Sequence, residues 1–272
     1  MTSIDTDYKD LIEAVLVHGQ KVHTRNSDVL RLSIQPLVAF YTPLISIRKT
    51  AWRNCLREWE FFMSGSNNIQ DLHPSVRSWW EPWADKDNGE IHFNYSRQFR
   101  HFVGDRGSVD QIQYLLDGVK DHPFSRRNVI TTWNTADMTD SLCPLTNCHS
   151  TIIQTFVNPE DNSLDLFTYQ RSVDLICGFP HNIFQMYSFL LWLAHWGKRK
   201  VGMLSWMGGD VHIYDSHREL AQCMLDTKVP DDYFTPSLVY SPPGDDNTYR
   251  ADHFSLDGPY APVLTDKAEM VV

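Results

Sequence analysis

The 272-residue sequence lacks an excess of basic charge, which argues against a general nucleic-acid coat protein. Its 34 acidic residues outnumber its 24 lysines and arginines, giving a formal net charge of −10. Most of such a surface repels a phosphate backbone. Small anionic substrates stay compatible with the sequence, because a few arginines can form a local positive pocket. We therefore expect no nucleic-acid partner.

The sequence also lacks a secretion signal and a long apolar run. Its first ten residues, MTSIDTDYKD, have neither the basic nor the apolar part of a signal peptide. The most apolar stretch, from Asn182 to Gly197, is too short and too interrupted by polar residues to cross a bilayer. The five cysteines have no regular spacing, which favours reduced thiols over a disulfide framework. We expect a cytoplasmic protein without membrane contact.

Familiar cofactor and metal motifs are missing as well. There is no P-loop and no GxGxxG, HExxH or CxxC pattern. Cys148 and His149 are adjacent, but neighbouring residues on a strand point to opposite faces, so the pair predicts no metal site. Without further context, Cys148 would be interpreted as a structural thiol, because free cysteine packs like a small hydrophobe.

Hydrophobic periodicity predicts a mixture of helices and strands. Helical spacing covers residues 8–19, 50–65, 109–123 and 180–197. Alternating patterns predict strands over 27–41 and 128–134, a hairpin over 150–172, and a strand, turn and strand over 201–217. Residues 67–94, rich in tryptophan, predict an ordered but irregular segment. Because regular βαβ alternation is absent, we expect one α+β domain spanning residues 1–272.

A polar cluster changes the interpretation of Cys148. The run YQRSVDLICGFPHN, residues 169–182, places polar side chains at a strand end just before a helix. Arg171 and Ser172 suit a phosphate, since a guanidinium fork and a hydroxyl both donate hydrogen bonds. The alternative is a surface ion pair of Arg171 with Asp174. Further on, GGDVHIYDSH contains two alternate polar residues of one strand face, which either reach one ligand or form a half-buried pair.

Together these motifs resemble the thymidylate synthases and the related pyrimidine nucleotide hydroxymethylases. The likeness extends to EWEFFMSGSNNIQDLH, WWEPWAD, SRRNVITTWN, VHTRNSDVLRLSI and the C-terminal KAEMVV, and so covers nearly the whole chain. It implies a three-layer fold in which a large mixed sheet packs against helices and forms the dimer face. It also implies one-carbon transfer from 5,10-methylenetetrahydrofolate to C5 of a pyrimidine nucleotide, without a metal.

The resemblance implies catalytic roles for four residues. Cys148 matches the nucleophile that adds to C6 of the base. Glu58 and Tyr95 match residues that organise water and proton transfers at the base. Asn182 matches the residue that reads the base. Its carboxamide suits uracil, because it can donate to O4 and accept from N3–H, so dUMP is the expected substrate.

Further matches concern binding of nucleotide and folate. The nucleotide phosphate is expected to contact Arg25, Arg126, Arg127, Arg171 and Ser172, and the sugar 3'-hydroxyl His212 and Tyr214. Arg126 and Arg127 match a pair that reaches across from the other subunit, which implies an obligate homodimer. The folate is expected to contact Asp174, Gly178 and one of Trp79 and Trp80.

Departures from the family gather at the base and the folate. Asn147 replaces a usual proline before the nucleophile, and His181 replaces a usual phenylalanine beside Asn182. GEIHFNY (89–95) and Gly178-Phe179 resemble the hydroxymethylases. This pattern favours water as the group that attacks the C5 methylene, and hence 5-hydroxymethyl-dUMP, as in a phage-type enzyme of a host cytoplasm. The alternatives are dTMP synthesis, which a closing C-terminal tail favours by excluding water, and a non-catalytic nucleotide- or RNA-binding protein.

Overall fold

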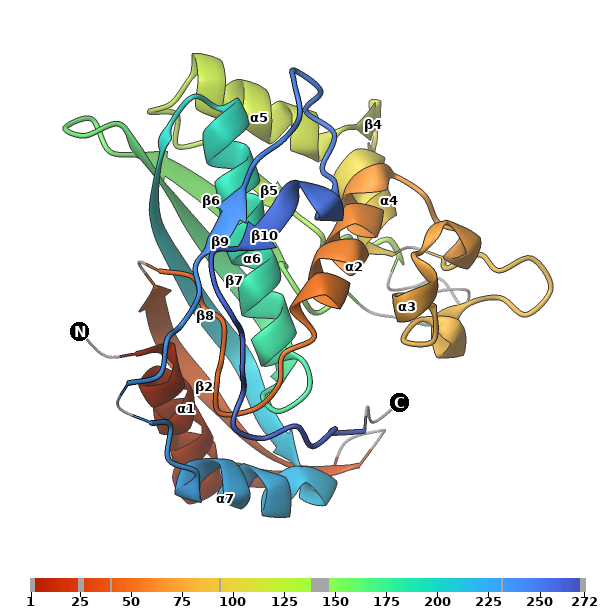
Figure 1. The fold of residues 1–272 in the computed structure, drawn as a ribbon. Coiled ribbons are helices and arrows are strands. Elements are labelled where there is room, and N and C mark those ends of the chain that lie inside the picture. The colour runs from red at the N-terminus through yellow and green to blue at the C-terminus, as the bar shows by residue number, and fades with distance from the viewer. Residues whose placement is uncertain are drawn as a thin grey trace.

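The core of the computed structural model is a six-stranded sheet with the strand order β1-β2-β8-β7-β6-β5 (Figure 1). The structure describes residues 3–23, 27–39, 41–92, 94–137, 147–230 and 232–269. The strands are β1 (Gln20–His23), β2 (Asp28–Ala39), β5 (Val129–Thr131), β6 (Ile152–Val157), β7 (Ser163–Asp174) and β8 (Lys200–Tyr214). Strands β7 and β8 run parallel and the other neighbours antiparallel, so the predicted large mixed sheet is confirmed.

Helix α6 (Phe179–Trp196) is the central helix and packs against β7 and β8. It connects these two strands, because parallel neighbours need a crossover. Most of its side chains are buried, which explains why its sequence is apolar on nearly all sides. Pro180 lies in its first turn, where an amide hydrogen has no helical partner to lose. None of the helices in the described part of the chain is long and apolar enough to cross a membrane.

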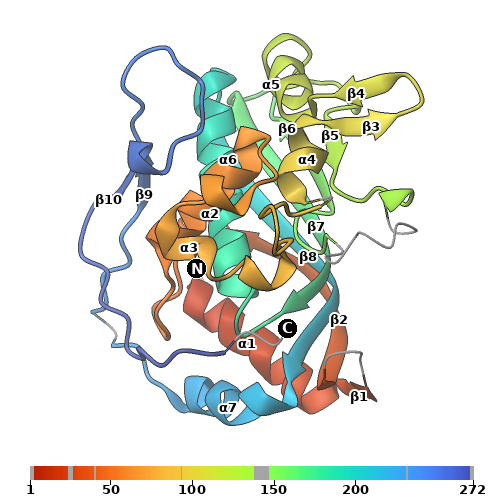
Figure 2. The same ribbon diagram turned by 90° about the vertical axis from the view of Figure 1, so that its right-hand side faces the viewer.

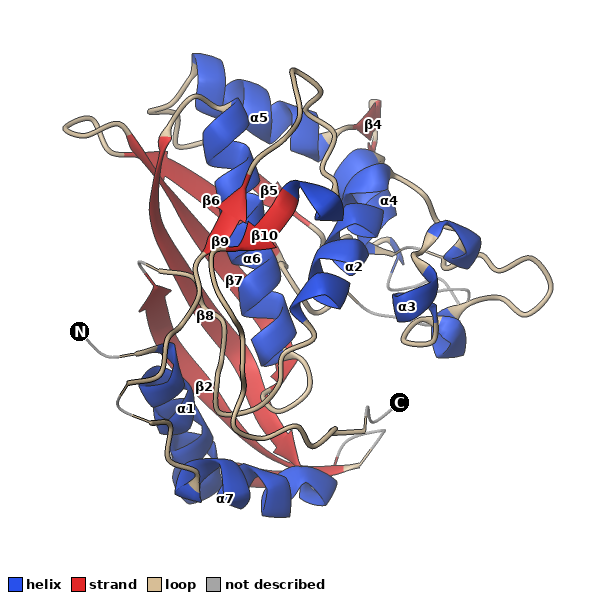
Figure 3. Cartoon of the chain, in the orientation of Figure 1, coloured by secondary structure: helices blue, strands red, loops and turns tan. Residues whose placement is uncertain are grey.

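Helices α1 (Ile4–His18) and α2 (Trp52–Ser64) flank α6 (Figure 3). Tyr8 of α1 stacks on Phe179 with 5.5 Å between ring centroids, and Trp52 of α2 meets Phe184 edge to face at 6.5 Å. Alternate side chains of β6 point away from these helices and stay exposed. The sheet therefore has one face covered by helices and one face with apolar side chains in solvent.

Capping residues set the ends of the predicted helices. Gly65 ends α2 with a φ of 87°, a left-handed conformation that suits glycine. Ser3 caps α1, which begins at Ile4 and so extends beyond the predicted start. Asp110 caps α5 (Gln111–Asp121) by accepting a hydrogen bond from a backbone amide of its first turn.

The tryptophan-rich segment is ordered and irregular, as predicted. It consists of turns and three short helices, which are η1 (Ile69–Asp71), α3 (Pro74–Arg77) and η2 (Glu81–Trp83). It packs over α2, where the rings of Trp80 and Phe62 meet edge to face at 5.4 Å (Figure 2). It leads into α4 (Tyr95–Arg100), which also contacts α2.

Short elements complete the fold. They are β3 (Phe102–Gly104), β4 (Gly107–Val109), η4 (Asp215–His217), α7 (Arg218–Asp226), β9 (Leu238–Tyr240), η5 (Ala251–His253) and β10 (Phe254–Leu256). After β10 the chain returns past the beginning of α6, so that the C-terminal segment lies beside the loop between β7 and α6 (Figure 1).

The predicted strand, turn and strand over residues 201–217 is wrong. Strand β8 runs unbroken through Gly208 and Gly209, and its pairing with β7 continues on both sides of them. A Cβ on Gly208 would lie 2.3 Å from Val211 and 2.5 Å from the Trp206 ring. Glycine is therefore required at this point because a side chain would not fit inside the sheet, where the register between β2 and β8 shifts. The two glycines do not reverse the chain.

Candidate active site

Cys148 lies in a turn that leads into β6, and the Tyr95 hydroxyl faces it from the beginning of α4. The phenol oxygen accepts hydrogen bonds from the backbone amides of Cys148 (2.9 Å) and His149 (3.0 Å). Its own hydrogen is then free to point to Cys148 Sγ, 3.4 Å away. Burial raises the pKa of Tyr95 well above its usual range, so the phenol keeps its proton and can donate to a thiolate.

Arg171 brings a positive charge to the same turn. From β7 its Nε donates to the carbonyl oxygen of Asn147 at 2.8 Å, and its guanidinium lies 5.0 Å from the centre of the Trp133 ring. Thr151 joins the two segments. Its hydroxyl donates to the Cys148 carbonyl and accepts from the Arg171 amide, both at 3.1 Å. A cation is thus fixed beside the candidate nucleophile.

The turn at Cys148 contains a strained residue. Ser150 has a φ of 50°, which is uncommon for a residue with a side chain. Its hydroxyl lies 3.3 Å from Met186 Sδ, and the Thr132 hydroxyl lies 3.2 Å from its carbonyl oxygen. Backbone strain that neighbouring elements hold in place is typical of a functional site.

Glu58 projects from α2 with both carboxylate oxygens hydrogen-bonded. Trp80 Nε1 donates to one oxygen at 2.6 Å, and Gln185 Nε2 donates to the other at 2.8 Å. Burial raises the pKa of Glu58 more than these two hydrogen bonds lower it. A carboxyl group with a raised pKa can hold and release a proton closer to neutral pH, as an acid–base group must.

His149 packs in the core despite its place next to the nucleophile. Its ring meets Trp59 at 5.6 Å and Tyr95 at 6.1 Å, both edge to face. Neither ring nitrogen makes a hydrogen bond to any described residue. Burial lowers its pKa to about 3, so the ring is neutral. We interpret His149 as a packing residue.

Trp79 and Trp80, which the sequence left as alternatives for the folate contact, have different surroundings. Trp80 is buried and bonded to Glu58, whereas Trp79 is half-buried and lies 5.5 Å from the His181 ring. His181 Nδ1 donates to the Cys177 carbonyl at 2.8 Å, and its Nε2 has no hydrogen-bond partner in the described ranges. Burial lowers the pKa of His181 to about 4, so this ring is also neutral.

Asp174 ends β7 in a tight turn that leads to Gly178 and α6. Its Oδ1 accepts from the amides of Ile176 (2.9 Å) and Cys177 (3.2 Å), and its carbonyl accepts from the Gly178 amide at 2.9 Å. Oδ2 lies 3.7 Å from His217 Nδ1. The turn fixes the direction of the carboxylate and leaves Oδ2 for another partner.

Asn182, His212 and Tyr214 lie on α6 and β8. The Asn182 carboxamide makes no hydrogen bond to a described residue, as expected of a group kept for a ligand. The rings of His212 and Tyr214 meet edge to face at 5.1 Å. A hydrogen bond from His212, at 3.2 Å, is the main cause that lowers the pKa of Asp210. Asp210 pairs with Ser172 across β7 and β8, so the sugar and phosphate candidates are neighbours.

Two predicted arginines do not join this arrangement, and a third, Arg25, is not among the described residues. Arg126 and Arg127 are exposed in the turn before β5, and no described side chain pairs with their guanidinium groups. Within one chain, Arg126 and Arg127 therefore contribute no positive charge to the candidate phosphate site.

Sequence reasoning missed Gln185 and His217. Gln185 bridges Glu58 and the carbonyl oxygen of Cys55, which it reaches at 3.0 Å. Its position could have indicated a role in the site, because Gln185 follows Asn182 by three residues and so lies on the same side of an otherwise apolar helix. His217 is buried beside Asp174, and no spacing in the sequence indicated this contact.

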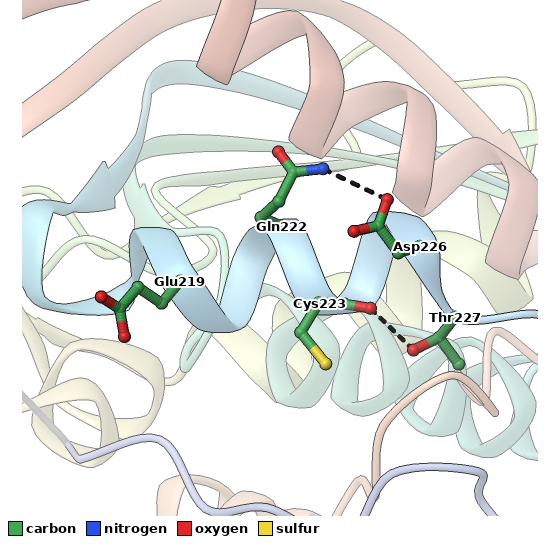
Figure 4. A pocket seen from close by; sticks show the side chains of 5 residues that line it. All are labelled: Glu219, Gln222, Cys223, Asp226 and Thr227. Carbon is green, nitrogen blue, oxygen red and sulfur yellow. Dashed lines mark hydrogen bonds between the residues drawn. The ribbon is translucent and has the colours of Figure 1, made fainter.

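A separate hollow on α7 does not suit the same ligands. Its lining includes Glu219, Cys223 and Asp226, and the thiol of Cys223 is exposed (Figure 4). Both charged side chains there are negative, so the hollow repels a nucleotide phosphate or a folate glutamate. The turn at Cys148 is therefore the better candidate site.

Comparisons with known proteins agree with this geometry. The family model described as thymidylate synthase matches residues 6–272. A thymidylate synthase from Corynebacterium aurimucosum is 32% identical over 276 residues, which cover 100% of this chain and 99% of that protein. Both matches span Cys148, Arg171 and His212. The chain therefore belongs to the thymidylate synthase family.

Proposed function

We propose that the protein transfers a one-carbon unit from 5,10-methylenetetrahydrofolate to C5 of dUMP, with Cys148 as the nucleophile. The observation that carries the proposal is the Tyr95 hydroxyl aimed at the Cys148 sulfur next to the Arg171 cation. C5 of uracil reacts poorly until a thiolate adds to C6 and shifts electron density to C5. A hydrogen-bond donor and a cation are the groups that stabilise such a thiolate.

Glu58 handles protons at the base. The electron density that the thiolate pushes into the ring collects at O4 and C5, and a proton must later leave C5. Glu58 can exchange this proton because burial raises its pKa. Gln185 and Trp80 hold the carboxyl group in place during the exchange.

Asn182 selects uracil. Its carboxamide can donate to O4 and accept from N3–H of uracil at once. Cytosine presents an amino group and a bare N3 instead, so one pairing becomes repulsive. An unpaired polar group in a buried site costs about 1–3 kcal/mol, which is enough to discriminate the two nucleotides.

The residues near Asp174 suit the folate. The folate supplies the methylene carbon. Asp174 Oδ2 is an acceptor held by a rigid turn, and the half-buried rings of Trp79 and His181 offer flat surface for a conjugated ring. Gly178 adds no side chain to the beginning of α6, which lets a ligand approach the backbone.

The active unit is a homodimer formed through the bare face of the sheet. Ile152 and Phe156 on this face are 38% and 48% exposed. Apolar side chains in a row on a sheet face mark an interaction surface. A second copy covers them and brings Arg126 and Arg127 to the phosphate of the other subunit. Because catalysis needs a reduced thiol, we place this dimer in the cytoplasm.

The similarity to the thymidylate synthase of Corynebacterium aurimucosum favours dTMP as the product. A thymidylate synthase aligned from end to end at 32% identity guides the choice of the second half-reaction. In that reaction the exocyclic methylene at C5 takes a hydride from tetrahydrofolate, which becomes dihydrofolate. The hydroxymethylation that the sequence favoured is the second candidate.

One observation favours hydroxymethylation. His181 Nε2 is a buried acceptor without a partner in the described part of the chain, and the ring is neutral. Such a nitrogen can accept a hydrogen bond from a water molecule and direct the water's oxygen to the methylene. A phenylalanine, usual at this position in the family, cannot do so.

The mass of the nucleotide product decides between the two reactions. The purified protein is incubated with dUMP and methylenetetrahydrofolate, and the product is examined by mass spectrometry and by dihydrofolate absorbance. A methylated nucleotide with dihydrofolate supports thymidylate synthesis. A hydroxymethylated nucleotide with tetrahydrofolate supports the second candidate. Binding of dUMP without turnover would show a non-catalytic protein and overturn both.

A further inference from the structure

Three unlike side chains meet behind the C-terminal segment. Asp174, Cys177 and His217 each offer one ligand atom, and these atoms all lie within 4.8 Å of one another. The carboxylate Oδ2 of Asp174 lies 3.7 Å from Nδ1 of the His217 imidazole. A tetrahedral Zn²⁺ ion, with bonds of about 2.0–2.3 Å, needs its ligand atoms about 3.3–3.6 Å apart. The cluster therefore requires only a small contraction to bind such an ion.

His217 is the independent sign of a missing partner. The residue is only 5% exposed, and its Nδ1 makes no hydrogen bond in the described part of the chain. Its other nitrogen, Nε2, donates to the Glu269 carbonyl at 2.8 Å, so Nδ1 is the nitrogen left to bind an ion. Nδ1 lies 3.7 Å from the negative Asp174 carboxylate, which is too far for a direct hydrogen bond. A cation between the two groups would contact both.

The surroundings already have the hydrogen bonds that support a metal site. Metal-binding histidines typically donate their second N–H to a carbonyl, as His217 does to Glu269. Metal-binding carboxylates are held by hydrogen bonds to the oxygen that faces away, as Asp174 Oδ1 is held by the amides of Ile176 and Cys177. These contacts fix the ring and the carboxylate before any ion arrives.

We propose that Asp174, Cys177 and His217 form a binding site for one Zn²⁺ ion, with a fourth position open to water or to a ligand. A thiolate and an imidazole select Zn²⁺ over Mg²⁺ or Ca²⁺, which prefer oxygen ligands. Binding replaces the Cys177 proton, which goes to the buffer, and the sulfur gives up its 3.6 Å contact with the Glu269 carbonyl. The two negative ligands neutralise the ion, so the Arg48 guanidinium bound to the Ile176 carbonyl does not oppose it.

Zinc at this site would regulate the reaction. This consequence rests on the proposed function, in which Asp174 faces the folate. A carboxylate bound to Zn²⁺ no longer accepts hydrogen bonds from a pterin, and the ion also ties the C-terminal segment to the site through His217 and Glu269. Zn²⁺ therefore competes with the folate and leaves dUMP binding unchanged.

The binding test uses Co²⁺ as an optical probe for Zn²⁺. The reduced full-length protein is freed of metal with a chelator and titrated with Co²⁺, and Zn²⁺ then displaces it. We expect one equivalent to produce a thiolate-to-cobalt charge-transfer band. Cys177→Ser should abolish this band, and His217→Gln should weaken binding at least about tenfold. Circular dichroism checks that both variants fold, and Cys177→Ala serves as a second sulfur-free variant.

Cys223→Ser is the matched control, because Cys223 is an exposed thiol beside two carboxylates on α7. It should leave the band unchanged. Absence of the band in the wild type, its survival in Cys177→Ser, or its loss in Cys223→Ser would each overturn the site. The regulatory step is measured separately. Zn²⁺ should raise the KM for the folate at least about tenfold in the wild type but not in Cys177→Ser. A protein without turnover would reject the proposed function while the cobalt band still decides the metal site.

Discussion

Tyr95 accepts two backbone hydrogen bonds and keeps its own hydrogen for the Cys148 sulfur. The family resemblance gave this tyrosine a place in a water network, whereas the structure assigns it a direct contact with the nucleophile. Local sequence could not show this, because the two residues are 53 positions apart. At the scale of single residues, the sequence supplied the chemical groups and the fold supplied their partners.

Replacing the nucleophile should separate binding from turnover. We expect Cys148→Ser to lower kcat by a factor of about 10⁴ or more, since loss of a nucleophile removes the covalent route. The affinity for dUMP, measured by calorimetry, should change little because the phosphate and base contacts remain. Cys223→Ser on α7 should retain full activity. Substantial turnover by Cys148→Ser would mean that another residue is the nucleophile.

Asn182→Asp should change the preferred base. A carboxyl group loses one hydrogen bond to uracil, and in protonated or water-bridged form it can satisfy the amino group and N3 of cytosine. We expect the ratio of kcat/KM for dUMP to that for dCMP to fall about ten- to hundredfold. The assay compares both nucleotides with the wild type and the variant. An unchanged ratio would show that Asn182 does not read the base.

His149 should make the protein sensitive to acid. Its pKa is about 3 in the folded state, below its usual value of 6.5. Between these values the unfolded state binds more protons, so the free energy of unfolding falls as the pH drops below 6.5. The loss from pH 7 to pH 5 is about 2 kcal/mol for this residue.

His149→Phe tests this expectation, since a phenyl ring keeps the contacts with Trp59 and Tyr95. Urea unfolding at pH 7 and pH 5 should show a smaller loss in the variant by about 2 kcal/mol. His181 keeps part of the pH dependence in both proteins. His122→Phe, at an exposed position, should behave like the wild type. Equal losses in all three proteins would show that His149 takes up protons in the folded state.

At the scale of elements, helices were more predictable than strand β8. Apolar periodicity and Gly65 predicted the course of α2, because the signals for a helix and its end are local. Gly208 and Gly209 looked like a turn, but their role follows from the Trp206 ring and Val211, which crowd the backbone. Gln185 was missed for a similar reason, since Glu58, its partner, belongs to a helix 127 residues earlier.

The crowding at Gly208 gives a prediction for β8. We expect Gly208→Ala to lower the free energy of unfolding by about 1–3 kcal/mol, because the added methyl group must displace the Trp206 ring or Val211. Gly104→Ala is the matched control, since a Cβ there meets no atom within 4 Å. Chemical unfolding of both variants measures the difference. Equal stability would mean that β8 relaxes at its register shift.

At the scale of the whole molecule, the fold brings together segments that are far apart in the described chain. Strand β2, near the N-terminus, pairs with β8, and the C-terminal segment contacts the loop before α6. A single domain, as the sequence predicts, would unfold in one cooperative transition. The bare apolar face of the sheet suits the predicted dimer, because a second copy would remove its apolar side chains from solvent.

Mixed dimers test whether subunits share their sites. Arg126→Ala protein mixed with Cys148→Ala protein should recover about a quarter of the wild-type activity, because random exchange makes half of the dimers mixed and each has one intact site of two. Each variant alone should be nearly inactive. Subunit exchange is verified with differently tagged chains. Complete exchange without recovery would reject an arginine donated by the other subunit.

The pairing of β2 with β8 also has a consequence for synthesis on the ribosome. Strand β2 ends at Ala39, but its partner β8 is complete only at Tyr214, which lies 175 residues further along the chain. At translation rates of about 5–20 residues per second, one edge of β2 waits roughly 10–35 seconds for its neighbour. An unpaired strand edge invites aggregation. The nascent chain should therefore depend on chaperones, and slower translation before β8 should lower the yield of folded protein.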